Sequence, residues 1–315
     1  MRELGQRMLR EEPQRIYDAL QLLVRASAED AQACALIATL AGAGAGTPQS
    51  WPIALDYLAR AAELGSAMAQ RQLQVLAQPP GSEADAAATR NRGWRELTRR
   101  VGLDVWLSAP PASPLPYGSR LIVIPELLPS AACDWLIERA RPLLLPASTY
   151  DPTTGAPQSD PDRSNSTAEF DLVETDLVLL LVRARIASVL GMPPTALEYT
   201  NVLHYRPGQE FKPHYDFLDP TAPGLAREIQ RLGQRVATCL VYLNNDYLGG
   251  QTEFPRLGLR HRGKGGDALL FHSIDRTGTP DLDTLHAGLP PTRGEKWLLS
   301  QFVRLRPTPI DGAPA

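Results

Sequence analysis

Asn201-Val-Leu-His-Tyr-Arg-Pro-Gly-Gln-Glu-Phe-Lys-Pro-His-Tyr-Asp216 is the stretch around which the rest of this chain is organised. It ends in His214-Tyr-Asp216, and because side chains alternate between the faces of a β-strand, the imidazole and the carboxylate would point to the same side. One imidazole nitrogen and one carboxylate oxygen are two of the three ligands in the facial set of non-haem iron sites. The pair therefore predicts a metal site that needs one more ligand.

A third ligand is available downstream at His286, and ten residues later stands Lys296, one of only three lysines in the chain. Taken alone, His286 is most simply a hydrogen-bonded histidine near a strand end, and Lys296 is most simply a surface charge. The order and spacing of all four residues favour the metal site over these structural interpretations.

The composition indicates a globular protein without nucleic-acid chemistry. The 315 residues leave room for about two domains, and a hydrophobic content of 43% supports a packed core. A net charge of −3 offers no field that would favour nucleic acid, so no nucleic-acid partner is expected. The three cysteines include no Cys-x-x-Cys pair, which argues against a disulfide framework and a thiolate zinc site.

The sequence predicts a cytoplasmic protein with no membrane association. Residues 1–7 lack the apolar core of a signal peptide, and no apolar run reaches the roughly 18 residues of a membrane span. In a reducing cytoplasm Fe(II) would not be promptly oxidised, which suits an iron site.

Residues 12–77 are predicted to form short Ala-rich helices with an internal repeat of 36 residues, in which Leu22 matches Leu58 and Ile37 matches Leu73. Such a period is typical of helical-hairpin solenoids, and the run 54–70 resembles tetratricopeptide-like short repeats. About two repeats are fewer than the three that usually fold alone, so the module should pack on a second domain. It would either grip a partner or peptide substrate, or serve as a helical brace without a ligand.

The Pro-rich run 108–118 suits neither a helix nor a central strand and marks a domain boundary. We therefore predict a helical-repeat domain with a linker helix in residues 1–107 and a second domain in residues 108–315. The second domain should open with a strand at 120–124 and a helix at 131–144. A long loop at 146–168, either a lid or plain turns, and an apolar helix at 176–190 follow.

From Leu197 onward the pattern changes to short strands separated by Gly, Pro and Asn turns. They are expected at 198–205, 211–216, 235–243, 252–254, 267–271, 284–286 and 296–305. Short strands after leading helices predict an α+β fold, a double-sheet jelly roll with supporting helices, preceded by a small all-α helical-repeat domain.

The C-terminal two thirds of the chain, about residues 120–306, resembles the prolyl 4-hydroxylase family of Fe(II)/2-oxoglutarate dioxygenases. The motifs that carry the resemblance are Tyr205-x-Pro-Gly-x-x-Phe-x-x-His-x-Asp216, Arg235-x-Ala-Thr, Gly249-Gly-Gln-Thr-Glu-Phe-Pro255, Gly266-Asp-Ala-Leu-Leu-Phe271 and His286-Ala-Gly-x-Pro-x-x-x-Gly-x-Lys-Trp297.

The resemblance implies a double-stranded β-helix whose catalytic iron ligands are His214, Asp216 and His286. It also implies that 2-oxoglutarate and O2 occupy the three remaining coordination positions, with ascorbate as a candidate reductant. The residues that would bind the distal carboxylate of 2-oxoglutarate are Lys296, assisted by Tyr205 and Thr252.

Three further residues fall on family positions close to substrate or co-substrate. Arg235 occupies a position associated with substrate contact, Phe211 replaces the tyrosine usual in the family, and Phe302 replaces the common tryptophan. The resemblance therefore implies that these three side chains line the substrate site.

The predicted function is hydroxylation of an unactivated C–H bond of a prolyl residue in a peptide or protein, with succinate and CO2 as co-products. One alternative is the same chemistry on a free amino acid or a natural-product intermediate, which makes the substrate a small molecule. Another is a catalytically silent scaffold that acts through its helical repeats. A hydrolase is disfavoured because the sequence has no nucleophile elbow.

Overall fold

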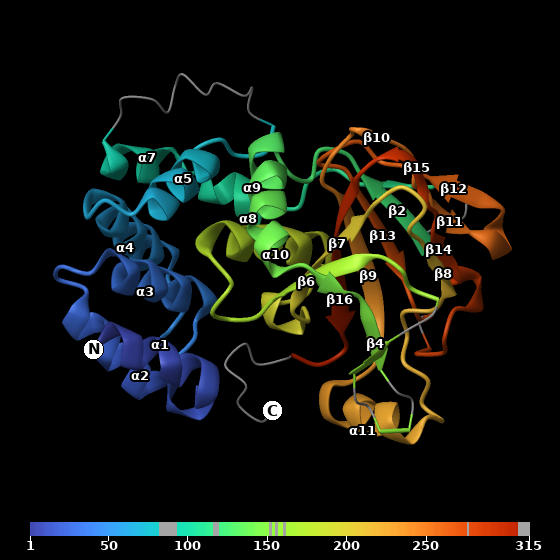
Figure 1. Cartoon of the computed structure of the whole chain (residues 1–315), viewed down its shortest axis with the longest axis horizontal. Helices are drawn as coiled ribbons and strands as arrows, with labels where there is room; N and C mark the ends of the chain where they lie inside the picture. Colours follow the sequence, from blue (N-terminus) through green and yellow to red (C-terminus); the bar gives the residue numbers. More distant parts are fainter. Residues whose placement is uncertain are drawn as a thin grey trace. The chain divides into compact units, whose positions relative to one another are not determined.

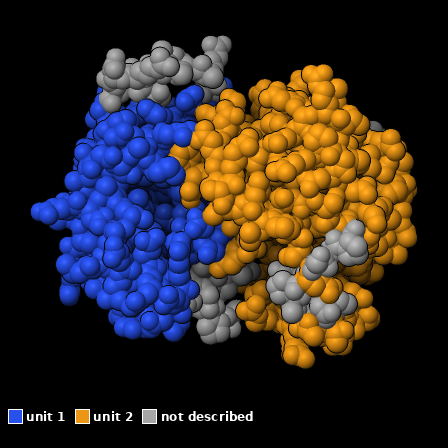
Figure 2. Space-filling view, viewed as in Figure 1, with its two compact units in different colours: residues 1–109, 170–191, 309–314 blue, residues 110–169, 192–308, 315 orange. Residues whose placement is uncertain are grey.

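The structure is a computed structural model that describes residues 1–81, 93–115, 120–150, 153–154, 157–159, 162–275 and 277–307. These residues group into two compact units (Figures 1 and 2). The first contains Met1–Ala109 and Phe170–Gly191, and the second contains the described residues of Pro110–Glu169 and Met192–Thr308. The predicted domains, 1–107 and 108–315, stay a prediction, and this grouping differs from them in assigning residues 170–191 to the first unit.

The first unit is helical, as the sequence predicts for the region before the strands. Its helices are α1 (Arg2–Glu11), η1 (Pro13–Arg15), α2 (Ile16–Ala26), α3 (Ala31–Ala43), α4 (Trp51–Glu63), α5 (Ala67–Leu76), α7 (Trp94–Arg100), α8 (Leu103–Leu107) and α10 (Leu177–Leu190). Consecutive helices from α1 to α5 pack on one another. Side-chain oxygens of Asp30, Ser50 and Ser66 accept from first-turn backbone N–H groups and so fix where α3, α4 and α5 begin.

Helix α10 explains why residues 170–191 belong to the helical unit. Every residue from Leu177 to Ala187 is buried, and the helix contacts α3, α5 and α8. A helix that is buried all round needs neighbours on its sides, and α3, α5 and α8 are among them. Within the described residues, no helix has both the length and the apolar character needed to span a bilayer.

The second unit is a jelly roll of antiparallel sheets, as predicted (Figure 1). The large sheet has the order β1-β2-β13-β9-β16-β7-β6-β3, and the small sheet has the order β12-β11-β14-β8. The strands of the large sheet are β1 (Ser113–Pro114), β2 (Leu121–Ile124), β3 (Leu145–Pro146), β6 (Ser166–Phe170), β7 (Thr200–Tyr205), β9 (Arg235–Tyr242), β13 (Ala268–His272) and β16 (Lys296–Arg304). Those of the small sheet are β8 (Phe211–His214), β11 (Thr252–Phe254), β12 (Leu259–His261) and β14 (His286–Gly288).

Two hairpin-like pairs and several helices complete the second unit. The pairs join β4 (Ser148–Tyr150) to β5 (Pro157–Ser159) and β10 (Tyr247–Gly249) to β15 (Pro291–Gly294). The helices are α9 (Ser130–Ala140), α11 (Pro223–Leu232) and the short η3 (Arg141–Leu143), η4 (Pro194–Ala196), η5 (Pro255–Leu257) and η6 (Leu282–Thr284). The stretch expected to be one long loop, 146–168, therefore contains strand pairing instead.

The core between the two sheets is apolar and brings the predicted site residues to one face. Leu203 and Tyr205 of β7, Leu240 of β9, Phe254 of β11 and Leu298 of β16 belong to one buried cluster. Because side chains alternate along a strand, the residues between them point to the outer faces. The register pairs Lys296 with Tyr205 and His286 with His214, so both halves of the expected site lie inside the roll.

Candidate metal centre and its cavity

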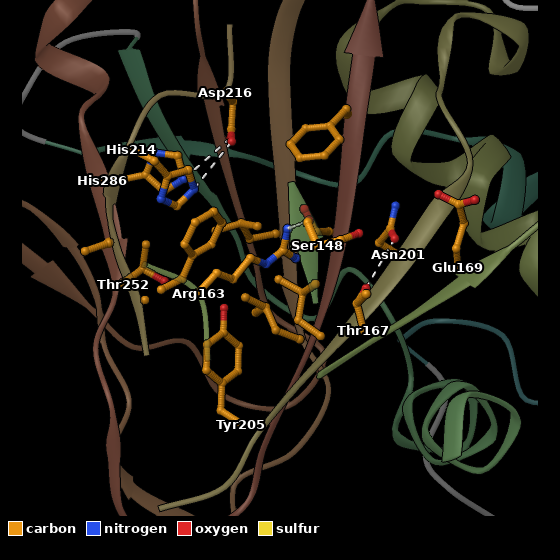
Figure 3. Close-up of a pocket in the computed structure, with 18 of the residues that line it drawn as sticks. Ser148, Arg163, Thr167, Glu169, Asn201, Tyr205, His214, Asp216, Thr252 and His286 are labelled. Atoms are coloured by element: carbon orange, nitrogen blue, oxygen red, sulfur yellow. Dashed lines mark hydrogen bonds and ion pairs between the residues drawn. The ribbon is translucent and has the colours of Figure 1, made fainter. Parts of the chain in front are cut away.

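His214, Asp216 and His286 converge on one point. Nε2 of His214 lies 3.7 Å from Oδ1 of Asp216, and Nε2 of His286 lies 3.5 Å from Oδ2 (Figure 3). All three offer ligand atoms within 4.8 Å of one another. Two imidazole nitrogens and one carboxylate oxygen at this separation match the facial donor set of non-haem iron.

Backbone carbonyls set the tautomer of both imidazoles. Nδ1 of His214 lies 2.8 Å from the carbonyl oxygen of Lys212, and Nδ1 of His286 lies 3.0 Å from that of Thr284. Each Nδ1–H donates to its carbonyl, which leaves the Nε2 lone pair directed at the shared point. Burial and the neighbouring His286 hold the pKa of His214 well below its usual value, so this imidazole is neutral, as a ligand must be.

The Asp216 carboxylate is held in its charged form. Burial alone would raise its pKa, but the imidazoles of His286 and His214 and a hydrogen bond from Thr238 together lower it. The Thr238 hydroxyl donates to Oδ2 of Asp216 at 2.6 Å. Thr238 lies on β9 of the large sheet, whereas both histidines lie on the small sheet, so the site joins the two sheets.

Replacing Thr238 by valine should weaken divalent-metal binding by about 10- to 100-fold, the usual effect of losing an outer hydrogen bond to a ligand. Valine keeps the volume but leaves Oδ2 of Asp216 without its donor. Titration with Co(II), followed by visible absorption, measures the change. Thr238→Ser keeps the hydroxyl and should bind normally, and equal affinity in the valine variant and the parent would contradict this role.

Lys296 is fully buried, and its Nζ has no hydrogen-bond partner among the residues that the structure describes. The nitrogen lies 5.0 Å from the ring centre of Tyr205 and 5.9 Å from that of Tyr242. Burial lowers the pKa of Lys296 to about 7. An ammonium that has lost water and gained no partner is costly, so the arrangement fits an anion that enters the same cavity.

The space beside Lys296 is kept open by small residues. A Cβ on Gly288 would lie 3.1 Å from the Tyr205 hydroxyl, which is closer than ordinary contacts. Thr252 is buried, and its hydroxyl lies 2.9 Å from that of Tyr242. Tyr205, Thr252 and Lys296 all line one cavity with the two histidines and Asp216.

The cavity has a volume of about 600 Å³ and also reaches the predicted substrate residues. Phe211 stacks on His214 with ring centres 3.5 Å apart. Arg235 lies over the ring of Phe302 at 3.9 Å and makes two bonds of 2.7 and 2.8 Å to Glu198. All three predicted side chains therefore line the cavity, with the Arg235 guanidinium already bound to a carboxylate.

Sequence reasoning missed Thr238 and Glu198, and it considered Arg163, which lines the cavity, only as a lid or turn residue. Thr238 is the last residue of the Arg235-x-Ala-Thr motif, a polar residue within an apolar strand, which is a usable signal. Glu198 lies between Arg235 and Arg304, and its pairing depends on register that one sequence does not reveal. Arg163 lies 4.6 Å over the Phe211 ring, from a stretch considered only as a lid or turns.

Comparison with known proteins also points to an iron-dependent oxygenase. The sequence model of the 2OG-Fe(II) oxygenase superfamily matches residues 200–304. Prolyl 4-hydroxylase 1 of Arabidopsis thaliana is 32% identical over 206 residues, which cover 61% of this chain and 71% of the relative. Probable prolyl 4-hydroxylase 3 of the same plant is 31% identical over 211 residues, with the same two coverages.

Similarity extends to solved structures. The viral collagen prolyl hydroxylase of Paramecium Bursaria Chlorella virus-1, in its 2OG complex, is 26% identical, with a TM-score of 0.46. The alignment covers 60% of this chain and 98% of that one.

A jelly roll that gathers two histidines and an aspartate around one point defines the class of non-haem iron oxygenases. The chain belongs to the prolyl 4-hydroxylase-like family of 2-oxoglutarate- and Fe(II)-dependent oxygenases. It is an oxygenase enzyme, which sets aside the catalytically silent scaffold.

Proposed function

We propose that this oxygenase hydroxylates a prolyl residue in a peptide or protein, consuming 2-oxoglutarate and O2 and releasing succinate and CO2. Ascorbate would serve as the reductant that keeps the iron ferrous. The observation that supports this most directly is the buried Lys296 ammonium without a described partner, in the same cavity as the three metal-ligating groups. The prolyl substrate is supported by the names of the relatives.

Each residue of the candidate site has a physical task in this proposal. His214, Asp216 and His286 would hold Fe(II), and Lys296 would neutralise the distal carboxylate of 2-oxoglutarate, assisted by the hydroxyls of Tyr205 and Thr252. When bound, the iron and its co-substrate supply the oxidant that replaces C–H by C–OH.

The cavity walls protect this chemistry from water. Leu203, Leu240 and Leu298 line the cavity beside the polar groups and belong to the buried core. An apolar wall lowers the local dielectric, which strengthens the pairing of Lys296 with a carboxylate. Phe211, stacked on His214, holds that imidazole in its ligating orientation.

The helical unit also has a place in the proposal. The packing of α1 to α5 in sequence order supports tetratricopeptide-like hairpins, and a repeat surface suits a peptide substrate. The brace without a ligand is the alternative.

Prolyl hydroxylation is tested by incubating the protein with Fe(II), 2-oxoglutarate, ascorbate and either blocked prolyl peptides, free proline or other small molecules. We expect mass spectrometry to find one added oxygen on the prolyl ring of peptides, in step with succinate. Oxygen added only to free proline or another small molecule would instead establish the small-molecule alternative.

A further inference from the structure

The inner face of the large sheet changes from apolar to polar along the cavity. Leu298 pairs with Leu203 across β16 and β7, and two residues further the pair is Ser300 with Asn201. All four side chains line the cavity. Residues directly opposite one another in antiparallel strands have Cβ atoms about 4.5–5.5 Å apart, so a polar pair follows an apolar pair on the same wall.

Thr167 extends the polar pair onto the next strand, β6. Its hydroxyl donates to Oδ1 of Asn201 at 3.3 Å, and Thr167 also lines the cavity. Figure 3 shows Thr167 and Asn201 at the opposite end of the cavity from His214, His286 and Thr252. We call Ser300, Asn201 and Thr167 the polar strip.

The polar strip has hydrogen-bonding capacity that the protein leaves unused. Ser300 is 4% exposed, and its hydroxyl makes no side-chain hydrogen bond within the described ranges. The Asn201 carboxamide accepts from Thr167 and donates to the carbonyl of Tyr199 at 3.3 Å, which leaves one N–H and one lone pair. The Ser300 hydroxyl is open to the cavity that it lines, so a ligand group can take up its free hydrogen-bonding capacity.

We propose that the polar strip binds a main-chain amide of an extended polypeptide substrate, beside the residue that is hydroxylated. This inference rests on the proposed oxygenase function and specifies which residues hold the peptide backbone of its substrate. A peptide group offers one N–H donor and one C=O acceptor, which the Ser300 hydroxyl and the Asn201 carboxamide can each match. Ser300 and Asn201 are thereby specificity-determining residues.

The charge of the cavity supports a peptide amide rather than the carboxylate of a free amino acid. The polar strip is neutral, whereas a carboxylate needs a cation or several donors. Of the nearby arginines, Arg235 is bound on two nitrogens by Glu198, and Arg163 donates to Asn165 and to the carbonyl of Ser148. Lys296 lies four residues from Ser300 along β16, roughly 13 Å at the usual strand rise, and is assigned to the co-substrate.

The test combines a protein variant with a backbone change in the ligand. Acetyl-Ala-Ala-Pro-Ala-Ala-amide is titrated by calorimetry into protein loaded with Mn(II) and 2-oxoglutarate. Two analogues carry an ester in place of the amide on the N-terminal or the C-terminal side of the Ala-Pro unit. One ester should weaken binding to the parent protein by roughly three- to tenfold, the range for one neutral hydrogen bond.

The Ser300→Ala variant should bind the amide peptide as weakly as the parent binds that ester, and should no longer distinguish amide from ester. Ser273→Ala is the matched control, because Ser273 is fully buried, its hydroxyl has no hydrogen-bond partner among the described residues, and it lies outside the cavity lining. Ser273→Ala should still bind the amide peptide more tightly than the ester.

Two results would overturn the inference: equal binding of amide and esters by the parent, or unchanged discrimination in Ser300→Ala. Absence of peptide binding in a protein that still converts 2-oxoglutarate to succinate would also overturn it while leaving the oxygenase function standing. If succinate formation is absent as well, the proposed function itself fails.

Discussion

Replacement of His286 by alanine should abolish the Fe(II)-dependent conversion of 2-oxoglutarate to succinate. The imidazole would supply one of the three proposed metal ligands, and its Nε2 lies 3.5 Å from Oδ2 of Asp216. Losing an outer partner of a ligand costs about 10- to 100-fold in metal affinity or activity, so losing the ligand itself should exceed 100-fold. The variant should therefore bind Co(II) weakly and release no succinate above background.

A matched control separates loss of a ligand from loss of the fold. His272→Ala removes an imidazole from the end of β13, where the half-buried His272 is outside both the metal cluster and the cavity lining. Circular dichroism and thermal unfolding should show that both variants are folded. Succinate formation by His286→Ala at the rate of the parent would refute the ligand assignment.

Replacement of Lys296 by alanine should raise the concentration of 2-oxoglutarate needed for half-maximal turnover by about 10- to 100-fold. This range follows from the roughly 1.5–3 kcal/mol of a hydrogen bond to a charged group. The ammonium is fully buried and has no partner in the described part of the chain, so it is available to neutralise the distal carboxylate. Initial rates of succinate formation across 2-oxoglutarate concentrations measure the change.

Lys264→Ala is the control for this experiment, because Lys264 is exposed and does not line the cavity. It removes one ammonium from the protein without touching the proposed co-substrate site. If Lys296→Ala and Lys264→Ala need the same concentration of 2-oxoglutarate as the parent, Lys296 has no role in binding it.

The pH dependence of 2-oxoglutarate binding provides a second measurement on Lys296. Burial lowers the pKa of this lysine to about 7, so in the free protein it is mainly charged at pH 6 and mainly neutral at pH 8. A bound carboxylate favours the ammonium and raises that pKa. Binding should therefore take up a proton at pH 8 but not at pH 6, as calorimetry in buffers of different ionisation enthalpy would show, and Lys296→Ala should lack this uptake.

The sequence predicts the types of the proposed metal ligands but not how the protein holds them. The expected strand at 211–216 would place His214 and Asp216 on one strand face, but β8 ends at His214. Asp216 lies beyond the strand because the chain leaves the small sheet there, and the Thr238 hydroxyl on the large sheet fixes its carboxylate. His214 and Asp216 still lie close together, but the orientation of the Asp216 carboxylate depends on β9, which is distant in sequence.

For Lys296 and α10, too, the local sequence predicts the residue or helix type, whereas its place in the fold depends on distant contacts. A lysine at the start of an apolar strand is visible in the sequence, but its pairing with Tyr205 on β7 depends on the register between the two strands. The apolar pattern at 176–190 predicts a buried helix, and α10 is one. Its membership in the helical unit depends on contacts with α3, α5 and α8, which end at least 70 residues before α10 begins and so leave no local signal.

The most direct test is whether the purified protein, supplied with Fe(II), 2-oxoglutarate and O2, forms succinate. We predict succinate formation that requires iron, stops when a chelator is added, and rises when a suitable prolyl peptide is present. A folded protein that binds iron at His214, Asp216 and His286 yet leaves 2-oxoglutarate unchanged, with or without peptides, would contradict the assignment of this cavity as an oxygenase site.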